Sequence, residues 1–237
     1  MKLQDKIAIV TGGTGGAGLT VTETFLDEGA SVVVTYVKET EMNYLMARFE
    51  SPPECLLCIN TDVTLEEDIE KMVKHVLEKF GRIDVLINLV GGVTKWLPIV
   101  DTSEKVWDFM LNLNLKSAFL CTKAVLPTMI QQQRGKIVSV SAMPALHPAP
   151  KKGSYAVAKA GVITLMQTIA EEVKEHNIQA NVIVPSIIAT EANIQASPDE
   201  DYSKWVTPDQ VAQLILFLSS EASDGITGSV IKIFGKV

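Results

Sequence analysis

The sequence predicts an α/β protein: a doubly wound sheet of seven parallel strands with helices on both faces. Apolar segments of strand length alternate with amphipathic segments of helix length along the whole chain. This alternation is typical of βαβ units with right-handed crossovers. Residues 7–10 and 32–34 are apolar at every position, as expected for parallel strands that are buried on both faces.

The expected elements follow one another with short connections. The predicted strands span residues 6–11, 31–36, 55–60, 83–88, 136–141, 178–184 and 229–234. The predicted helices span residues 16–28, 39–50, 65–80, 103–133, 154–176 and 208–219. Thr64 is the expected N-cap of the third helix, because its hydroxyl can accept a hydrogen bond from the first turn. Ligands of such sheets bind beyond the carboxyl ends of the strands, here Gly12, Tyr36, Asp62, Asn88, Ser141 and Pro185.

The composition indicates one globular domain over residues 1–237. The chain is 47% hydrophobic and 21% charged, and no linker or low-complexity tract interrupts it. Its net charge of −7 argues against nucleic acid or an anionic membrane as a partner. No apolar run approaches the roughly 20 residues that span a bilayer. The opening residues lead directly into a strand, so a cytoplasmic location is expected, with a removed transit peptide as the open alternative.

Two of the three cysteines, Cys55 and Cys58, form a C-x-x-C pair. In a strand, residues three apart point to opposite faces, and there is no second pair to complete a zinc site. We therefore expect buried, unreactive thiols and no metal.

A glycine-rich turn follows the first strand and opens a helix, with the sequence Thr11-Gly12-Gly13-Thr14-Gly15-Gly16-Ala17-Gly18. Gly12 permits the tight turn, and Gly16 and Gly18 let the backbone approach a ligand and the helix pack on the sheet. The helix N–H groups and dipole can then bind a pyrophosphate. The alternative is a flexible loop.

Tyr155 and Lys159 are four residues apart in a predicted helix and share one face of it. A free phenol has a pKa near 10, and a neighbouring ammonium would favour the phenolate and lower that pKa. The pair can therefore act as an acid/base group. The alternative is an ordinary surface pair.

Together these motifs make the chain similar, over nearly its whole length, to the short-chain dehydrogenase/reductase family. The T-G-x-x-x-G-x-G turn and the Y-x-x-x-K pair are the most specific matches. The remaining matches are Asp62-Val63, Asn88-Leu89-Val90-Gly91, Asn114 and Pro185-Ser186-Ile187-Ile188-Ala189-Thr190. Leu89, Val90 and Ser186 depart from the family pattern, and its D-G-G near the C-terminus is only weakly echoed by Phe234-Gly235-Lys236.

The resemblance implies a Rossmann-like fold and reversible hydride transfer between NAD(P) and a small carbonyl compound or secondary alcohol. It implies a catalytic set of Asn114, Ser141, Tyr155 and Lys159. Asn114 would hold a relay water, or else make a structural hydrogen bond. The implied cofactor-binding set is Gly12, Thr14, Gly15, Gly16, Ala17, Gly18, Tyr36, Lys38, Asp62, Val63, Asn88, Gly91, Tyr155, Lys159, Pro185, Ile188 and Thr190. The family also implies a homodimer or homotetramer built through the long helices.

The family's serine, which steadies the substrate oxygen, is the point of disagreement. It usually lies thirteen residues before the tyrosine, where this chain has Ala142, with Ser141 adjacent. Neighbouring strand residues point to opposite faces, so Ser141 replaces that serine only if a bulge in residues 143–153 realigns it. Ser141 is the provisional candidate. The same departures support a second hypothesis, a catalytically impaired protein that binds NAD(P) in a regulatory or scaffold role.

The second strand ends in Tyr36 without an acidic residue until Glu39, and Lys38 could pair with a 2′-phosphate. This favours NADP over NAD. A short lid is expected around residues 191–206, with Val93, Trp96 and His147 also at the substrate pocket. Lys151 and Lys152 precede Tyr155 and would either attract an anionic substrate or carrier or lie in a solvated loop.

Overall fold

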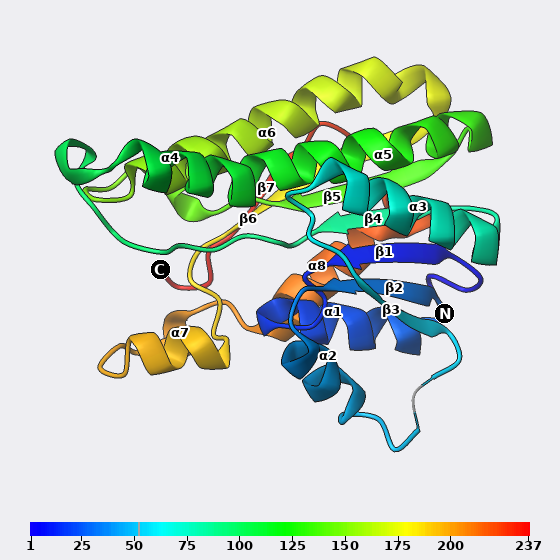
Figure 1. Ribbon diagram of the computed structural model, residues 1–237, viewed down its shortest axis with the longest axis horizontal. Helices are drawn as coiled ribbons and strands as arrows, with labels where there is room; N and C mark the ends of the chain where they lie inside the picture. The colour runs from blue at the N-terminus through cyan, green and yellow to red at the C-terminus, as the bar shows by residue number, and fades with distance from the viewer. Residues whose placement is uncertain (52) are drawn as a thin grey trace.

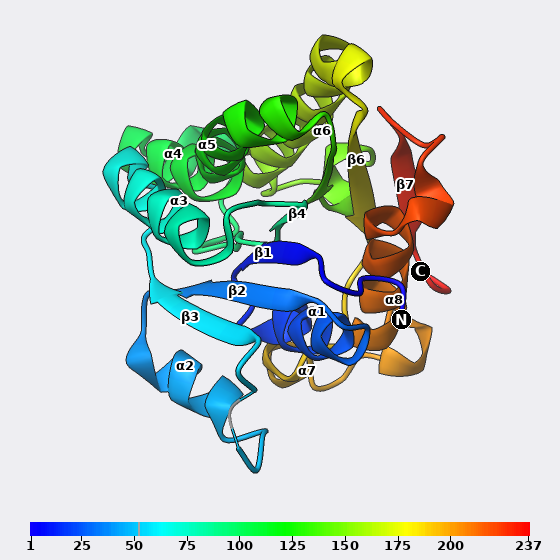
Figure 2. The same ribbon diagram turned by 90° about the vertical axis from the view of Figure 1, so that its right-hand side faces the viewer.

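The computed structural model describes residues 1–51 and 53–237. Its strands form one parallel sheet in the order β3-β2-β1-β4-β5-β6-β7, seen nearly edge-on in Figure 2. The predicted fold class is confirmed. The strands are β1 Ile7–Thr11, β2 Ser31–Tyr36, β3 Leu56–Asn60, β4 Val85–Asn88, β5 Gly135–Val140, β6 Ile178–Pro185 and β7 Val230–Ile233.

Helices cover both faces of this sheet, as Figures 1 and 2 show. α3, α5 and α6 lie on one face, and α1 and α8 pack together on the other. The helices are α1 Gly16–Asp27, α2 Glu39–Met46, α3 Glu66–Phe80, α4 Glu104–Leu111, α5 Ser117–Gln132, α6 Gly153–Val173, α7 Glu191–Ala196 and α8 Pro208–Ser219. None of the helices among the described residues is long and apolar enough to cross a membrane.

Two apolar clusters, one on each side of the sheet, explain why the strands are apolar throughout. Ile9 and Val33 belong to the cluster with α3, α5 and α6, while Val10 and Val32 belong to the cluster with α1 and α8. Successive side chains of a strand point to opposite faces, so a strand buried on both sides needs an apolar residue at each position.

The strand order reverses between β1 and β4. From β1 the chain first adds β2 and β3 on one side, then crosses to β4 on the other. A crevice opens at the carboxyl ends of strands at such a reversal, so the turn after β1 and the loop after β4 face one another there.

The long helical region expected over residues 103–133 is confirmed, and within it a π-helical segment, Asn112–Lys116, joins α4 to α5. Two expectations about local structure are wrong. Thr64 does not cap α3, which begins after Leu65, because its hydroxyl donates instead to Asp62 at 2.7 Å. Cys55 and Cys58 are only half-buried, because β3 is the edge strand of the sheet.

Candidate active site

The glycine-rich turn brings bare backbone to the end of β1. Gly12 and Gly16 have φ of +70° and +49°, which a side chain disfavours. A Cβ at Gly18 would lie 2.1 Å from the Gly12 carbonyl oxygen, so only glycine allows α1 to start this close to β1. Because the N-cap of α1 is Gly15, no side chain caps the first N–H groups of the helix, and its first turn has no acidic residue. The helix N-terminus therefore suits an anionic phosphate group.

A cavity of about 710 Å³ extends from this turn to Tyr155. It is lined by twelve of the residues expected from the sequence: Gly12, Thr14, Gly15, Gly16, Ala17, Gly18, Gly91, Ser141, Tyr155, Lys159, Pro185 and Ile188. The structure thus gathers the end of β1, the loop after β4, the end of β5 and the start of α6 around one space. Its polar turn at one end and acid/base pair at the other fit a dinucleotide with its reactive ring beside Tyr155.

Other expected residues lie around this cavity rather than on its wall. Asn88 is buried, and its Nδ2 donates to Thr122 and Ser139 at 3.2 and 3.0 Å, so it ties β4 to α5 and β5. Its Oδ1 has no hydrogen-bond partner among the described residues, and its contact with a cofactor stays a prediction. Asp62 accepts from the backbone N–H of Thr64. Tyr36 ends β2, Val63 is buried, Lys38 is exposed, and Thr190 caps α7.

Asn114 holds the loop that follows β4. Its Oδ1 accepts from the Gly92 N–H at 2.9 Å, and its Nδ2 donates to the carbonyls of Gly92 and Met110 at 2.9 and 3.1 Å. The side chain therefore makes the structural hydrogen bonds that were the alternative to a relay role, and the relay water stays a prediction. Asn114 lies in the π-helical segment, a conformation often found at functional sites.

Gly91 is where this loop meets the lysine. A Cβ at this position would lie 2.7 Å from Lys159 Nζ and 2.8 Å from Asn114 Oδ1. Glycine therefore lets the loop approach the ammonium and the amide without displacing either side chain.

Burial controls the acid/base pair. It raises the pKa of Tyr155 to about 12 and lowers the pKa of Lys159 to about 8. The Lys159 ammonium donates to the Val140 carbonyl at 2.8 Å and lies 6.0 Å from the centre of the phenol ring. The expectation that Lys159 lowers the phenol pKa is wrong for the protein alone, because desolvation dominates. Tyr155 is accordingly a neutral phenol at pH 7, able to give a proton.

Ser141 lines the cavity, but its hydroxyl is engaged within the protein. It is buried, and its hydroxyl donates to the Lys159 carbonyl at 2.8 Å. A hydroxyl has one proton, so in this arrangement Ser141 cannot also donate to a substrate oxygen. Ala142 also lines the cavity but has no polar atom in its side chain. The backbone of Ser141 continues the pairing with β6, since its N–H donates to the Ile183 carbonyl at 2.9 Å.

The adenosine end carries a carboxylate that the sequence analysis missed. Glu41 lines the cavity, and its side chain pairs with the Lys38 ammonium at 3.3 Å. Their spacing of three residues at the start of α2 was the available signal. Lys38 is thus already paired with a carboxylate.

At the substrate end, Val93, Trp96, Met143 and Lys152 line the cavity, together with Asn193 and Ala196 of α7. The Trp96 ring meets the Tyr155 ring edge to face, with centres 5.8 Å apart. His147 lies against Phe234 instead.

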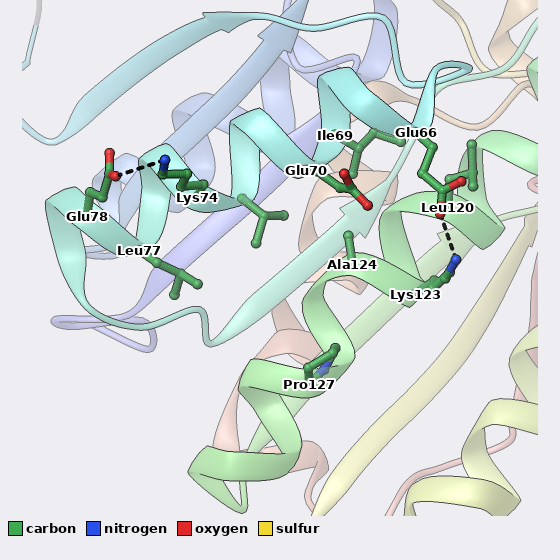
Figure 3. Close-up of a pocket in the computed structure, with 11 residues that line it drawn as sticks. Glu66, Ile69, Glu70, Lys74, Leu77, Glu78, Leu120, Lys123, Ala124 and Pro127 are labelled. Carbon is green, nitrogen blue, oxygen red and sulfur yellow. Dashed lines mark hydrogen bonds and ion pairs between the residues drawn. The ribbon is translucent and has the colours of Figure 1, made fainter.

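A second cavity, of about 650 Å³, lies between α3 and α5, as Figure 3 shows. Its floor is apolar and includes Ile69, Leu77 and Leu120. Charged residues at its rim form ion pairs such as Glu66–Lys123. Its described lining contains no acid/base pair comparable with Tyr155 and Lys159, so the first cavity is the candidate active site.

Comparisons with known proteins agree with this geometry. The family model described as short chain dehydrogenase matches residues 6–201. The chain is 35% identical to the 3-oxoacyl-[acyl-carrier-protein] reductase FabG of Thermotoga maritima, over 99% of this chain and 98% of the relative. It is 33% identical to an NAD-dependent glycerol dehydrogenase of Listeria innocua, over 98% and 94%. A solved structure described as ElxO with NADP bound has a TM-score of 0.92 and 29% identity, and 98% of each chain is covered.

The chain therefore belongs to the short-chain dehydrogenase family. It is an enzyme, an NAD(P)-dependent oxidoreductase.

Proposed function

We propose that this enzyme reduces a small carbonyl compound with NADPH as the preferred cofactor. One observation carries the proposal: Tyr155 is a half-buried neutral phenol one helical turn before the buried Lys159, in the cavity that begins at the glycine-rich turn. A neutral phenol is the form that a reduction requires, since it can protonate a carbonyl oxygen. A bound nicotinamide would supply the hydride to the carbonyl carbon.

The residues of the chain have separate roles in this proposal. Tyr155 gives its proton to the substrate oxygen and is then reprotonated from solvent. Lys159, held by Val140, stabilises the phenolate and contacts the nicotinamide ribose. Asn114 keeps Gly91 and Gly92 in place and supports the proton relay. The glycine-rich turn binds the pyrophosphate at the start of α1.

NADPH is favoured because β2 ends without an acidic residue to hold a ribose 2′-hydroxyl, and Lys38 is near that end of the cavity. The NADP-bound structure named above supports this choice, although the Listeria relative is named as NAD-dependent. To bind the 2′-phosphate, the Lys38 ammonium must leave its ion pair with the Glu41 carboxylate. A direct comparison of NADPH and NADH binding tests the preference.

The decisive experiment follows NADPH oxidation with a panel of small diketones, quinones and β-ketoesters. We expect turnover by the wild type and its loss in Tyr155→Phe, with NADPH affinity nearly unchanged because the lost hydroxyl serves proton transfer. Strong residual turnover in that variant would refute the mechanism.

A second candidate is a protein that binds NADPH in a regulatory role. The missing hydroxyl donor at Ala142 favours it, whereas relatives named as reductases and dehydrogenases favour the enzyme. NADPH binding without turnover by the wild type, together with turnover by Ala142→Ser, would support this candidate.

We also propose a homodimer or homotetramer formed through the long helices. The support is that Phe109, Phe119 and Val157, on α4, α5 and α6, are 47%, 44% and 49% exposed. Light scattering on the wild type and on Phe119→Glu tests it; a monomeric wild type would contradict it.

Residues 191–206 are proposed as a substrate lid, because Asn193 and Ala196 line the cavity. The cytoplasmic location stays a prediction.

A further inference from the structure

A lysine at the substrate end of the cavity has no role in the mechanism above. Lys152 is the N-cap of α6, three residues before Tyr155, and it lines the cavity. Its ammonium lies 5.1 Å from the centre of the Trp96 ring, and the Trp96 ring contacts the Tyr155 ring. The cation is therefore separated from the acid/base phenol by one indole. A cation over an indole face is held by the ring quadrupole, which fixes where its charge lies.

None of the ion pairs among the described residues includes Lys152. The first turn of α6 has no acidic residue either. A cation at a helix N-terminus is opposed by the helix dipole, so its position is not explained by the stability of α6. The solvated-loop alternative is not favoured either, because Lys152 is half-buried against the cavity wall.

The hydroxyls of the two serines that line the cavity already donate to backbone carbonyls. Ser141 donates to the Lys159 carbonyl, and Ser186 donates to the Phe234 carbonyl at 2.8 Å. Ala142 offers no donor. A substrate held only by Tyr155 would be free to pivot about its carbonyl oxygen, so a second polar anchor is needed to present one face of the carbonyl.

We propose that Lys152 is that anchor and that the natural substrate carries an anionic group, a carboxylate or a phosphate. The anion pairs with the ammonium beside Trp96 while the carbonyl oxygen meets Tyr155. This inference rests on the proposed carbonyl reduction and specifies its substrate class. Lys152 is then a specificity-determining residue, and it takes no part in proton or hydride transfer.

The test compares an anionic substrate with its uncharged ester in two variants, one at Lys152 and one at the neighbouring Lys151. Acetoacetate and methyl acetoacetate share the reacting carbonyl and differ in the charge beyond it. Lys152→Gln removes the anchoring charge. Lys151→Gln removes the same charge from the neighbouring exposed residue, which does not line the cavity, and serves as the control.

We expect Lys152→Gln to raise the KM for acetoacetate about tenfold to a hundredfold, the value of a charge-assisted hydrogen bond. Its kcat/KM for the ester should change less than threefold, and Lys151→Gln should resemble the wild type with both compounds. The acetoacetyl thioesters of pantetheine and of its 4′-phosphate extend the comparison. A Lys152-dependent preference for acetoacetate identifies a carboxylate, and one for the phosphorylated thioester identifies a phosphate.

Equal losses for charged and neutral substrates, or equal effects of the two glutamine variants, would overturn the inference while leaving carbonyl reduction intact. A separate binding readout covers the case in which no compound turns over, which would count against the proposed function instead. Calorimetry with acetoacetate and the phosphorylated thioester on Tyr155→Phe, saturated with NADPH, should show binding that Lys152→Gln weakens at least tenfold. Absence of any Lys152-dependent binding there overturns the inference as well.

Discussion

The buried charge of Lys159 should destabilise the folded enzyme at neutral pH, and the size of the effect follows from its pKa. Burial lowers that pKa from 10.5 to about 8. Between pH 8 and pH 10.5 the unfolded chain keeps a proton that the folded protein has lost, so raising the pH favours the folded state. The penalty is fully present below pH 8 and is relieved as the pH rises towards 10.5.

Integrating the linkage relation from pH 7 to pH 10 gives a gain of about 2–3 kcal/mol in the free energy of unfolding. For a chain of this length such a gain corresponds to a rise in Tm of about 5–10 °C. Tyr155 must be kept out of the measurement, because burial raises its pKa from 10.0 to about 12. That shift makes the folded state lose stability as the pH rises above 10.

The assay is therefore urea denaturation of Tyr155→Phe and of Tyr155→Phe/Lys159→Met from pH 7 to pH 10. The methionine loses the hydrogen bond to Val140, but that loss is independent of pH, and all other titrations cancel in the difference. We expect the single variant to gain about 2–3 kcal/mol relative to the double variant over this range. A difference constant within about 0.5 kcal/mol would refute the reasoning, since it would mean that Lys159 titrates alike in both states.

The remaining predictions concern the oxygen site and the cofactor. Ala142→Ser should raise kcat for a neutral ketone at least tenfold, towards the roughly 10²–10³-fold rate effect that one oxyanion donor contributes. Ser141→Ala should change kcat little, because the Ser141 hydroxyl already donates to the Lys159 carbonyl. Steady-state kinetics of the two variants side by side tests both expectations. Lys38→Glu should weaken NADPH binding, and Glu41→Gln should strengthen it because Lys38 is then free of its carboxylate partner. Each change should be about twofold to fivefold, as expected for an exposed ion pair. Titration of NADPH fluorescence measures both, and an equal change for NADH in either variant would contradict the assignment.

The fold was predictable because its signals are local and repeated. The apolar runs of the strands set the parallel sheet, and the glycine positions after β1 set the turn at its reversal. Gly18 illustrates the reason: its neighbour, the Gly12 carbonyl, is only six residues away in the sequence. A short stretch of sequence therefore contains both partners of the contact.

The parts of the site that escaped prediction depend on contacts between distant segments. The bond from the Ser141 hydroxyl to the Lys159 carbonyl joins the end of β5 to the middle of α6. Sequence alone could show that Ser141 and Ala142 point to opposite faces, but not which partner occupies the hydroxyl. Asn114, in the π-helical segment, likewise bonds to the distant loop at Gly92. Asn88 donates to Thr122 and Ser139 from two other elements.

The direction of the Tyr155 pKa shift was predicted wrongly for a related reason. Spacing along a helix predicts that Lys159 is near, yet it says nothing about how dry the pair is. In the structure desolvation has a larger effect on both pKa values than the attraction between the two groups. The protein alone therefore has a phenol that is harder to ionise and an ammonium that loses its proton more easily.

These two shifts bear on the missing serine. A phenol that holds its proton firmly is a weak acid, and with alanine at 142 there is no hydroxyl beside it to share the charge that develops on the substrate oxygen. The positive charge on Lys159 is then the main stabilisation available to the phenolate, and it is lost above about pH 8. Reduction should therefore slow as the pH rises through 8, and Ala142→Ser should make the rate less dependent on Lys159 because the hydroxyl adds a donor that does not titrate. If the pH dependence of kcat were the same in both proteins, Lys159 would not be compensating for the absent hydroxyl.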